Sequence, residues 1–208
     1  MNNSNDKLYS AWVERWKNCK EEQKLTVLGR AMFKAKRSVL ARVAGEFRPA
    51  SILEAGCALG ETMAVYHEMG MDVMGVDISE DAVALCKRKG LNAVHMDMAD
   101  LDRTFDMVSS DGMLEHFLNF EPHAKTLMEL AERYVLLIQP NYNSFMGQTL
   151  PWLANIIRGT VNVYEYNYRL EDFEAVFKRG GFDLVMSEPV FLDVFRVLVF
   201  QRRGQGDA

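Results

Sequence analysis

The stretch Ser51–Thr62, which reads SILEAGCALGET, decides the fold of this chain. It joins an apolar run to the glycine-rich segment Gly56–Gly60, and helix-forming residues follow from Glu61. This order predicts a strand, a tight turn that uses the backbone freedom of glycine, and a helix. Such a turn before a helix N-terminus leaves free N–H groups and a partial positive charge, which favour a bound carboxylate or phosphate. An ordinary strand–helix turn without a ligand is the competing interpretation.

A second apolar run, Met71–Ile78, contains Asp77 near its end, 17 residues after Gly60. In doubly wound folds, an acid at the tip of the second strand binds the hydroxyl groups of a ribose. An anion site and a diol site together predict a nucleoside-containing cofactor. The dinucleotide fingerprint G-x-G-x-x-G does not match this turn, because the glycine that follows Gly56 is Gly60.

The segment from Glu54 to Gly60 resembles motif I of the class I S-adenosylmethionine-dependent methyltransferases, (D/E)-x-G-x-G-x-G, with Ala58 in place of the middle glycine. The resemblance extends over roughly residues 49–200. It implies that the chain binds S-adenosylmethionine and releases S-adenosylhomocysteine, with Gly56–Gly60 facing the methionine portion. Glu54 is expected to orient this loop and to meet the ammonium group of the cofactor.

The same resemblance implies further cofactor contacts at the ends of later strands. Asp77 binds the ribose and Ile78 packs on the adenine, while Asp97 and Met98 meet the adenine edge; the competing interpretation is that Asp97 only caps a turn. Asp111, near the tip of the fourth strand, is a further candidate. The predicted cofactor-binding residues are therefore Glu54, Gly56, Ala58, Gly60, Asp77, Ile78, Asp97, Met98 and Asp111.

His116 is the best candidate for a catalytic base. The segment Asp111–His116, DGMLEH, resembles the family segment that lies under the methionine end of the cofactor and faces the acceptor. The sulfonium already activates the methyl group, so the protein mainly supplies proximity and alignment, worth roughly 7–11 kcal/mol of the barrier. A base that removes a proton from the acceptor can add to this, and histidine titrates near neutral pH. A histidine that only shapes the pocket is an equally good interpretation.

Strand and helix signals alternate along the rest of the chain. They predict an α/β fold, a doubly wound, mostly parallel seven-stranded sheet with an antiparallel last strand and helices on both faces. The expected strands are Ser51–Ala55, Asp72–Asp77, Asn92–Met96, Phe105–Ser110, Tyr134–Ile138, Phe182–Ser187 and Val190–Gln201, with Phe191–Phe200 as the antiparallel candidate. The expected helices are Glu61–Met69, one that starts at the N-cap Ser79 and stops at Gly90, Glu121–Ala131 and Leu170–Lys178.

Residues 1–48 are expected to form a helical extension to the core of residues 49–208. Apolar side chains recur at helical spacing in Lys7–Lys20, and a second helix is predicted from about Glu21 to Phe47, before Arg48 and Pro49. In the family, such helices cover the cofactor site. Trp12 and Trp16 suit a lid of this kind, and packing against the core explains them equally well.

Residues 142–168 are rich in aromatic side chains and carry no strand signal. Insertions after the fifth strand commonly form the acceptor pocket in this family, and long connections are often functional. The alternative is an extra helix, about Phe145–Arg158, that closes a groove without contacting a ligand.

Charge and composition exclude several classes of protein. The net charge of −5 argues mildly against nucleic acid as the main partner, and no apolar run is long enough to span a bilayer. The polar start MNNSNDK does not resemble a secretory signal, and three dispersed cysteines without metal-ligand spacing favour a reduced, cytoplasmic setting. The oligomeric state cannot be inferred.

The charge is distributed unevenly along the chain. Residues 1–48 carry 11 Lys and Arg against 5 Asp and Glu, whereas residues 49–208 carry 13 against 24. The basic residues either form the solvated faces of helices or attract an anionic acceptor.

A small-molecule acceptor is favoured over nucleic acid. Ser110-Asp111-Gly112 stands where methyltransferases of nucleobase amino groups carry a Pro-Pro motif, and the chain has no Pro-Cys pair for cytosine C5 methylation. O-, N-, S- and C-methylation all remain open. The alternatives are a nicotinamide-dependent oxidoreductase, disfavoured by the missing fingerprint, and a cofactor-binding module without catalysis.

Overall fold

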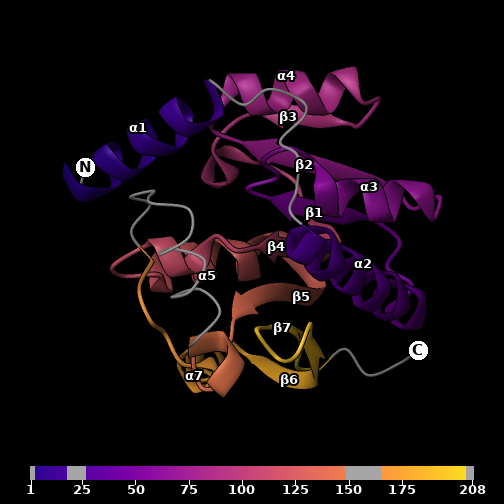
Figure 1. Ribbon diagram of the computed structural model, residues 1–208, viewed down its shortest axis with the longest axis vertical. Helices are drawn as coiled ribbons and strands as arrows, with labels where there is room; N and C mark the ends of the chain where they lie inside the picture. Colours follow the sequence, from indigo (N-terminus) through magenta and orange to yellow (C-terminus); the bar gives the residue numbers. More distant parts are fainter. Residues whose placement is uncertain (1–2, 18–26, 149–164, 205–208) are drawn as a thin grey trace.

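The computed structural model describes residues 3–17, 27–148 and 165–204 (Figure 1). Within these residues, seven strands form one sheet in the order β3-β2-β1-β4-β5-β7-β6. Six strands run parallel and β7 runs antiparallel to both of its neighbours, which confirms the predicted architecture. The strands are β1 (Ile52–Ala55), β2 (Val73–Asp77), β3 (Ala93–His95), β4 (Phe105–Asp111), β5 (Ala131–Pro140), β6 (Phe182–Val190) and β7 (Phe195–Arg202).

Helices cover both faces of the sheet and divide its hydrophobic core in two. The core on one face includes α2, α3 and α4, and the core on the other includes α5 and α7. The bounds are α1 (Asn3–Lys17), α2 (Val27–Phe47), α3 (Glu61–Glu68), α4 (Glu80–Arg88), α5 (Glu121–Leu130) and α7 (Leu170–Arg179), with short 3-10 helices η1 (Met98–Asp100) and η2 (Leu114–His116). The helix α4 starts as predicted, because the Ser79 hydroxyl accepts a hydrogen bond from Ala82 N.

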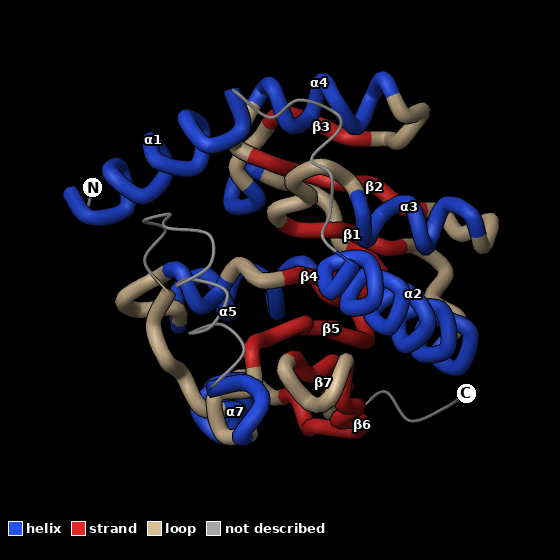
Figure 2. Tube along the Cα trace, viewed as in Figure 1, coloured by secondary structure: helices blue, strands red, loops and turns tan. Residues whose placement is uncertain are grey.

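The strand order places the candidate site at the centre of the sheet. The strands follow one another from β3 to β6 (Figure 2), and the chain reverses its direction of winding between β1 and β4. In open α/β sheets, ligands bind at such a switch point, outside the carboxyl ends of the strands. The predicted site residues at the ends of β1, β2 and β4 therefore lie at one edge.

The last two strands differ from the expected boundaries. The strand β6 continues to Val190 and β7 begins only at Phe195, so the strands predicted to start at Val190 or Phe191 begin too early. The turn between them holds Phe191, Leu192 and Asp193 at φ values of 44°, 56° and 63°. A turn with three non-glycine residues in the left-handed region carries no glycine signal, so the apolar run conceals it.

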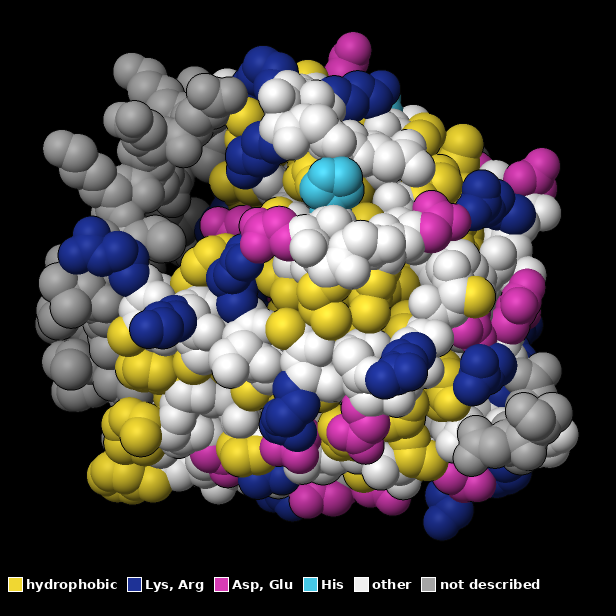
Figure 3. Space-filling view, turned by 90° about the vertical axis from the view of Figure 1, so that its right-hand side faces the viewer, with side chains coloured by type: hydrophobic (Ala, Val, Ile, Leu, Met, Phe, Trp, Pro, Cys, Tyr) yellow, Lys and Arg dark blue, Asp and Glu magenta, His cyan; other side chains and the backbone are white. Residues whose placement is uncertain are grey.

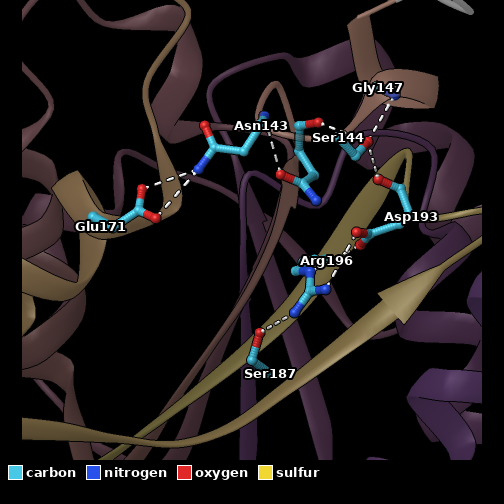
Figure 4. Close-up of polar contacts among 8 residues, drawn as sticks. Asn143, Ser144, Gly147, Glu171, Ser187, Asp193 and Arg196 are labelled. Carbon is cyan, nitrogen blue, oxygen red and sulfur yellow. Dashed lines mark hydrogen bonds and ion pairs between the residues drawn. The ribbon is translucent and has the colours of Figure 1, made fainter.

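This turn anchors the segment that follows β5 (Figure 4). The Ser144 hydroxyl donates to the carbonyl oxygen of Asp193 over 2.7 Å, and Arg196 binds the Asp193 carboxylate. On the other side, the Asn143 amide donates to Glu171 of α7. Residues 141–148 are thus held against both the β6–β7 turn and α7.

Two further findings concern the described residues. None of their helices has the length and apolar character that crossing a membrane requires. Two expectations fall outside them: the start of the second helix at residues 21–26 and the central part of the insertion at 149–164.

Candidate active site

A cavity of about 290 Å³ lies at the carboxyl ends of the strands. Its walls include eight of the predicted site residues: Gly56, Ala58, Asp77, Ile78, Asp97, Met98, Asp111 and His116. Glu54 and Gly60 do not line it. Residues from α1 and α2 also line the walls: Tyr9, Trp12, Arg15, Trp16 and Lys36. Trp12 and Trp16 were lid candidates, whereas the sequence did not assign the other three to the site.

The glycine-rich loop is tied to the protein by its own amides. The N–H groups of Gly56 and Cys57 both donate to Val76 O, and Gly60 N donates to Cys57 O. The free N–H groups expected in this loop are therefore largely used within the fold. The open amides belong instead to the first turn of α3, where the N-cap Gly60 supplies no side-chain cap.

Gly60 is required by packing and backbone conformation. Its φ is 76°, and a Cβ at this position would lie 2.5 Å from Leu91 Cδ1 and 2.9 Å from Cys86 Sγ. Ala58 also lies in the left-handed region, with φ at 45°. Its side chain still fits, which explains why the middle glycine of the motif is dispensable here.

Asp77, at the end of β2, binds the backbone of the glycine-rich loop. Its Oδ2 accepts a hydrogen bond from Ala58 N and its Oδ1 accepts one from Ser79 N, both over 2.8 Å. Burial raises the pKa of Asp77, although these two hydrogen bonds act in the opposite direction. Each carboxylate oxygen keeps a second lone pair, so Asp77 can hold the loop and still face the cavity as an acceptor.

Asp97 receives contacts from two elements. Its side chain accepts from Ala99 N and so caps η1, as the competing interpretation expected. It also accepts a hydrogen bond from the Tyr9 hydroxyl of α1. Burial, together with this carboxylate, raises the pKa of Tyr9 to about 12. Asp97 thus lines the cavity in contact with α1.

His116 lies in η2 and lines the same cavity. The residue is 7% exposed, and its ring packs edge-to-face on Trp12 with 4.8 Å between the centroids. The Arg15 guanidinium lies over the rings of both Trp12 and Trp16. The helix α1 therefore covers the cavity from Asp97 to His116.

Lys36 and Asp111 form an ion pair inside the cavity. Lys36 Nζ lies 2.5 Å from Asp111 Oδ2, which also accepts from the Thr62 hydroxyl. Burial opposes the charge of Lys36, but Asp111, Glu61 and Glu54 raise its pKa overall. The sequence did not indicate Lys36, because a lysine among the many charges of α2 resembles a solvated residue.

Glu54 lies near the end of β1 and does not line the cavity. It is 1% exposed, and its hydrogen bonds go to the Ser109 side chain and the Asp111 backbone, both on β4. Asp77 binds the backbone of the loop, and the expected role of Glu54 in orienting it stays a prediction. Burial raises the pKa of Glu54 to about 8, so the group supports the end of β4 mainly as a neutral acid.

The raised pKa of Glu54 predicts a pH dependence of stability. Between pH 4.5 and about pH 8 the folded protein keeps a proton that the unfolded chain releases, so the free energy of unfolding falls as pH rises. We expect Glu54→Gln to remove this component, at most about 1.4 kcal/mol per pH unit. Urea unfolding between these pH values measures it, with the exposed Glu46→Gln as the matched control. Identical pH slopes for Glu54→Gln and wild type would contradict the assignment.

The basic residues of α2 are largely paired with acids of the core. Besides Lys36, Arg37 binds Glu68 and Arg42 binds Glu188. On the face that Figure 3 shows, Lys and Arg side chains are interspersed with Asp and Glu. These contacts favour the interpretation of α2 as a charged helix face over that of a surface for anionic acceptors.

Comparison with known proteins gives a consistent result. Residues 28–187 match the family model of a methyltransferase domain, whereas no curated protein matches the chain. The fold is similar to that of the magnesium protoporphyrin IX methyltransferase from Synechocystis PCC 6803 with bound SAH (TM-score 0.72, 19% identity, 95% of this chain and 97% of that one). It is also similar to the 1,6-didemethyltoxoflavin-N1-methyltransferase from Burkholderia thailandensis (TM-score 0.68, 17% identity, 97% and 90% of the chains).

Proposed function

The chain belongs to the methyltransferase domain family, and from this premise we propose that it transfers the methyl group of S-adenosylmethionine to a small-molecule acceptor. One observation carries the proposal: two acidic strand ends, Asp77 and Asp97, and the glycine loop line the same cavity as His116. This arrangement supports an elongated ligand, with its adenosine part near Asp97 and its methionine part near Asp111.

The residues at the adenosine end fit this cofactor. Asp77 keeps acceptor capacity for the ribose hydroxyls, and Ile78 and Met98 supply apolar surface for the adenine. Asp97 can accept a hydrogen bond from an amino group. Tyr9, which contacts Asp97, encloses this end from α1.

At the proposed methionine end, the cavity has one cationic and one anionic side chain, which match the two charges of an amino acid. Asp111 is placed to accept from the cofactor's ammonium group, and Lys36 is placed to bind its carboxylate. The open amides of α3 add to the attraction for the carboxylate. The Lys36–Asp111 pair is thus complementary to a zwitterion, and charge-assisted hydrogen bonds of this type are among the strong ones.

Lys36→Met should therefore weaken the binding of S-adenosylhomocysteine and leave that of adenosine unchanged. Losing a hydrogen bond to a charged group costs roughly 1.5–3 kcal/mol, which corresponds to about 10- to 150-fold in Kd. Calorimetric titration with both ligands measures the effect. Lys34→Met, on the exposed side of α2, is the matched control. Equal weakening for both ligands would assign Lys36 to the fold instead of the methionine end.

When bound, the cofactor supplies a methyl group that its sulfonium already activates. The chain contributes position: Asp77 and the loop fix the adenosine, while α1 covers the cavity and excludes water. His116 is the proposed base for the acceptor proton. Residues 1–48 act in this proposal as a cover for the core, and residues 142–168 as the acceptor side.

The descriptions of the similar proteins mention different acceptors. They include a magnesium porphyrin and 1,6-didemethyltoxoflavin, and a third, from Thermotoga maritima, is described as a possible histamine N-methyltransferase (TM-score 0.71, 13% identity, 94% of this chain and 100% of that one). These names support a small-molecule acceptor without selecting one. Cys57 and Cys86 are free thiols, which supports a reduced, cytoplasmic setting.

Methyl transfer can be tested without knowing the acceptor. The full chain is incubated with methyl-labelled S-adenosylmethionine and fractionated metabolite extracts, and the label is followed into products. We expect one class of fraction to accept it. Cofactor binding without transfer into any fraction would instead favour a binding module without catalysis.

A further inference from the structure

Glu115 is a buried carboxyl group next to the cavity that the proposed methyl transfer does not use. It lies in η2, directly before His116, and is 4% exposed. Within the part of the chain that the structure describes, its Oε2 has no hydrogen-bond partner. Leaving a buried polar group unpaired costs about 1–3 kcal/mol, so an orphaned carboxylate oxygen beside a site points to a ligand.

The side chain of Glu115 turns back toward the cavity wall at Gly112. A Cβ on Gly112 would lie 3.2 Å from Glu115 Oε1, and Gly112 itself lines the cavity. The φ of Gly112 is 68°, in the region that favours glycine. Glu115 itself does not line the cavity, so its carboxyl group lies behind the wall at Gly112, where the wall consists of backbone alone.

Glu115 belongs to an acidic cluster with Glu165 and Asp111. The Tyr142 hydroxyl donates to Glu165 Oε2 over 3.0 Å, and Tyr142 feels the charges of both Glu165 and Glu115. Burial raises the pKa of Glu115 to about 8, and the charges of Glu165 and Asp111 act in the same direction. Near neutral pH Glu115 is therefore mainly a neutral acid, and a cation beside it would lower its pKa and favour the carboxylate.

Among the described cations, only Lys36 offsets part of the charge of this cluster. Lys36 Nζ is held by Asp111, and no other described Lys or Arg forms an ion pair with Glu115 or Glu165. In the proposed function, Asp111 and Lys36 are also the partners of the methionine part. Glu115 and Glu165 are therefore left for the second substrate.

Aromatic residues frame the same corner. Tyr166 N donates to Glu115 O over 2.8 Å, and the Tyr168 hydroxyl donates to Phe117 O over 2.9 Å. The rings of Tyr166 and Tyr168 lie 6.3 Å apart. These contacts go to backbone oxygens of Glu115 and Phe117 and place an aromatic segment beside η2, which favours a cation with an apolar body.

We propose that the acceptor carries a positively charged amine and that Glu115 binds this amine beside Gly112. The inference rests on the proposed methyl transfer and specifies its acceptor class. An ammonium group would satisfy the orphaned oxygen and offset the charge of the cluster. An anionic acceptor would meet like charge at close range and lose the hydrogen bond.

Three probes of similar size and different charge test the proposal: 2-phenylethylamine, 2-phenylethanol and 3-phenylpropionate. Each is titrated calorimetrically into the full chain saturated with S-adenosylhomocysteine, at about pH 8.5, where Glu115 is mostly ionised and the amine still carries its charge. We expect the amine to bind about tenfold or more tightly than the alcohol, and the anion to bind weakest. The titration with S-adenosylhomocysteine itself comes first, so failure of the proposed function is recognised separately.

Two variants test which residues cause the preference for the amine over the alcohol. Glu115→Gln keeps the shape of the side chain and should bring amine and alcohol to similar affinity. Glu165→Gln should lower the ratio of amine affinity to alcohol affinity. Because this position is exposed, the variant also tests the proposal if Glu115→Gln does not fold. Glu171→Gln, an exposed glutamate that binds Asn143, is the matched control and should keep the full ratio. Equal binding of the three probes, no binding of any, or an unchanged ratio in both variants would overturn the proposal.

Discussion

Replacing His116 with alanine should lower kcat by about 10²- to 10⁴-fold, the range that a general base contributes, while the Kd of S-adenosylhomocysteine stays close to the wild-type value. The histidine lines the cavity, and the hydrogen bonds of Asp77 to the backbone of Ala58 and Ser79 do not involve it. Its ring is held by the edge-to-face contact with Trp12. A base in this place acts on the acceptor and contributes little to holding the cofactor.

Comparing the effect on kcat with the effect on cofactor affinity distinguishes a catalytic role of His116 from a structural one. His67→Ala is the matched control, because His67 lies on the exposed side of α3 and does not line the cavity. Single-turnover rates with labelled S-adenosylmethionine give kcat, and calorimetry gives Kd. Full turnover in His116→Ala would assign this histidine to packing against Trp12.

Asp77→Ala should weaken cofactor binding by about 1–3 kcal/mol, or roughly 5- to 150-fold in Kd. Two effects combine: the ribose hydroxyls lose their acceptor, and the N–H groups of Ala58 and Ser79 lose theirs. The free energy of unfolding should fall as well, because the Ser79 amide is buried and the Ala58 amide is partly buried. Calorimetry and urea unfolding on the same variant measure the two parts.

Asp77→Asn separates these two parts of the Asp77 effect. The amide oxygen can still accept one backbone hydrogen bond, while the charge and one acceptor are lost. We expect its stability to lie between those of wild type and Asp77→Ala, with binding still impaired. Asp81→Ala, in the exposed first turn of α4, is the control. Wild-type affinity in Asp77→Ala would remove Asp77 from the site.

Much of the fold could be predicted because local signals agree with the tertiary arrangement. Ser79 caps α4 in the structure as its position before an acidic first turn suggested. Alternating apolar strands and amphipathic helices indicated a parallel sheet, and its topology brought Asp77 and Gly56 to one edge. Residues at strand ends are therefore predictable, because the register of the sheet determines where they lie.

Other features depend on contacts between distant segments and carry no local signal. Lys36 enters the cavity because α2 crosses the end of β4, which helical periodicity alone does not reveal. Glu54 matched a motif, yet its hydrogen bonds go to the neighbouring strand β4. The β6–β7 turn lacks glycine, and the orphaned oxygen of Glu115 becomes visible only once its surroundings are known.

The central claim is that the cavity binds one adenosyl thioether along its length, from Asp97 to Asp111. Calorimetric titration of the full chain with S-adenosylhomocysteine, and separately with NAD, tests it most directly. The account predicts saturable binding of S-adenosylhomocysteine at one site per chain and none of NAD under the same conditions. Binding of NAD without binding of S-adenosylhomocysteine would contradict it.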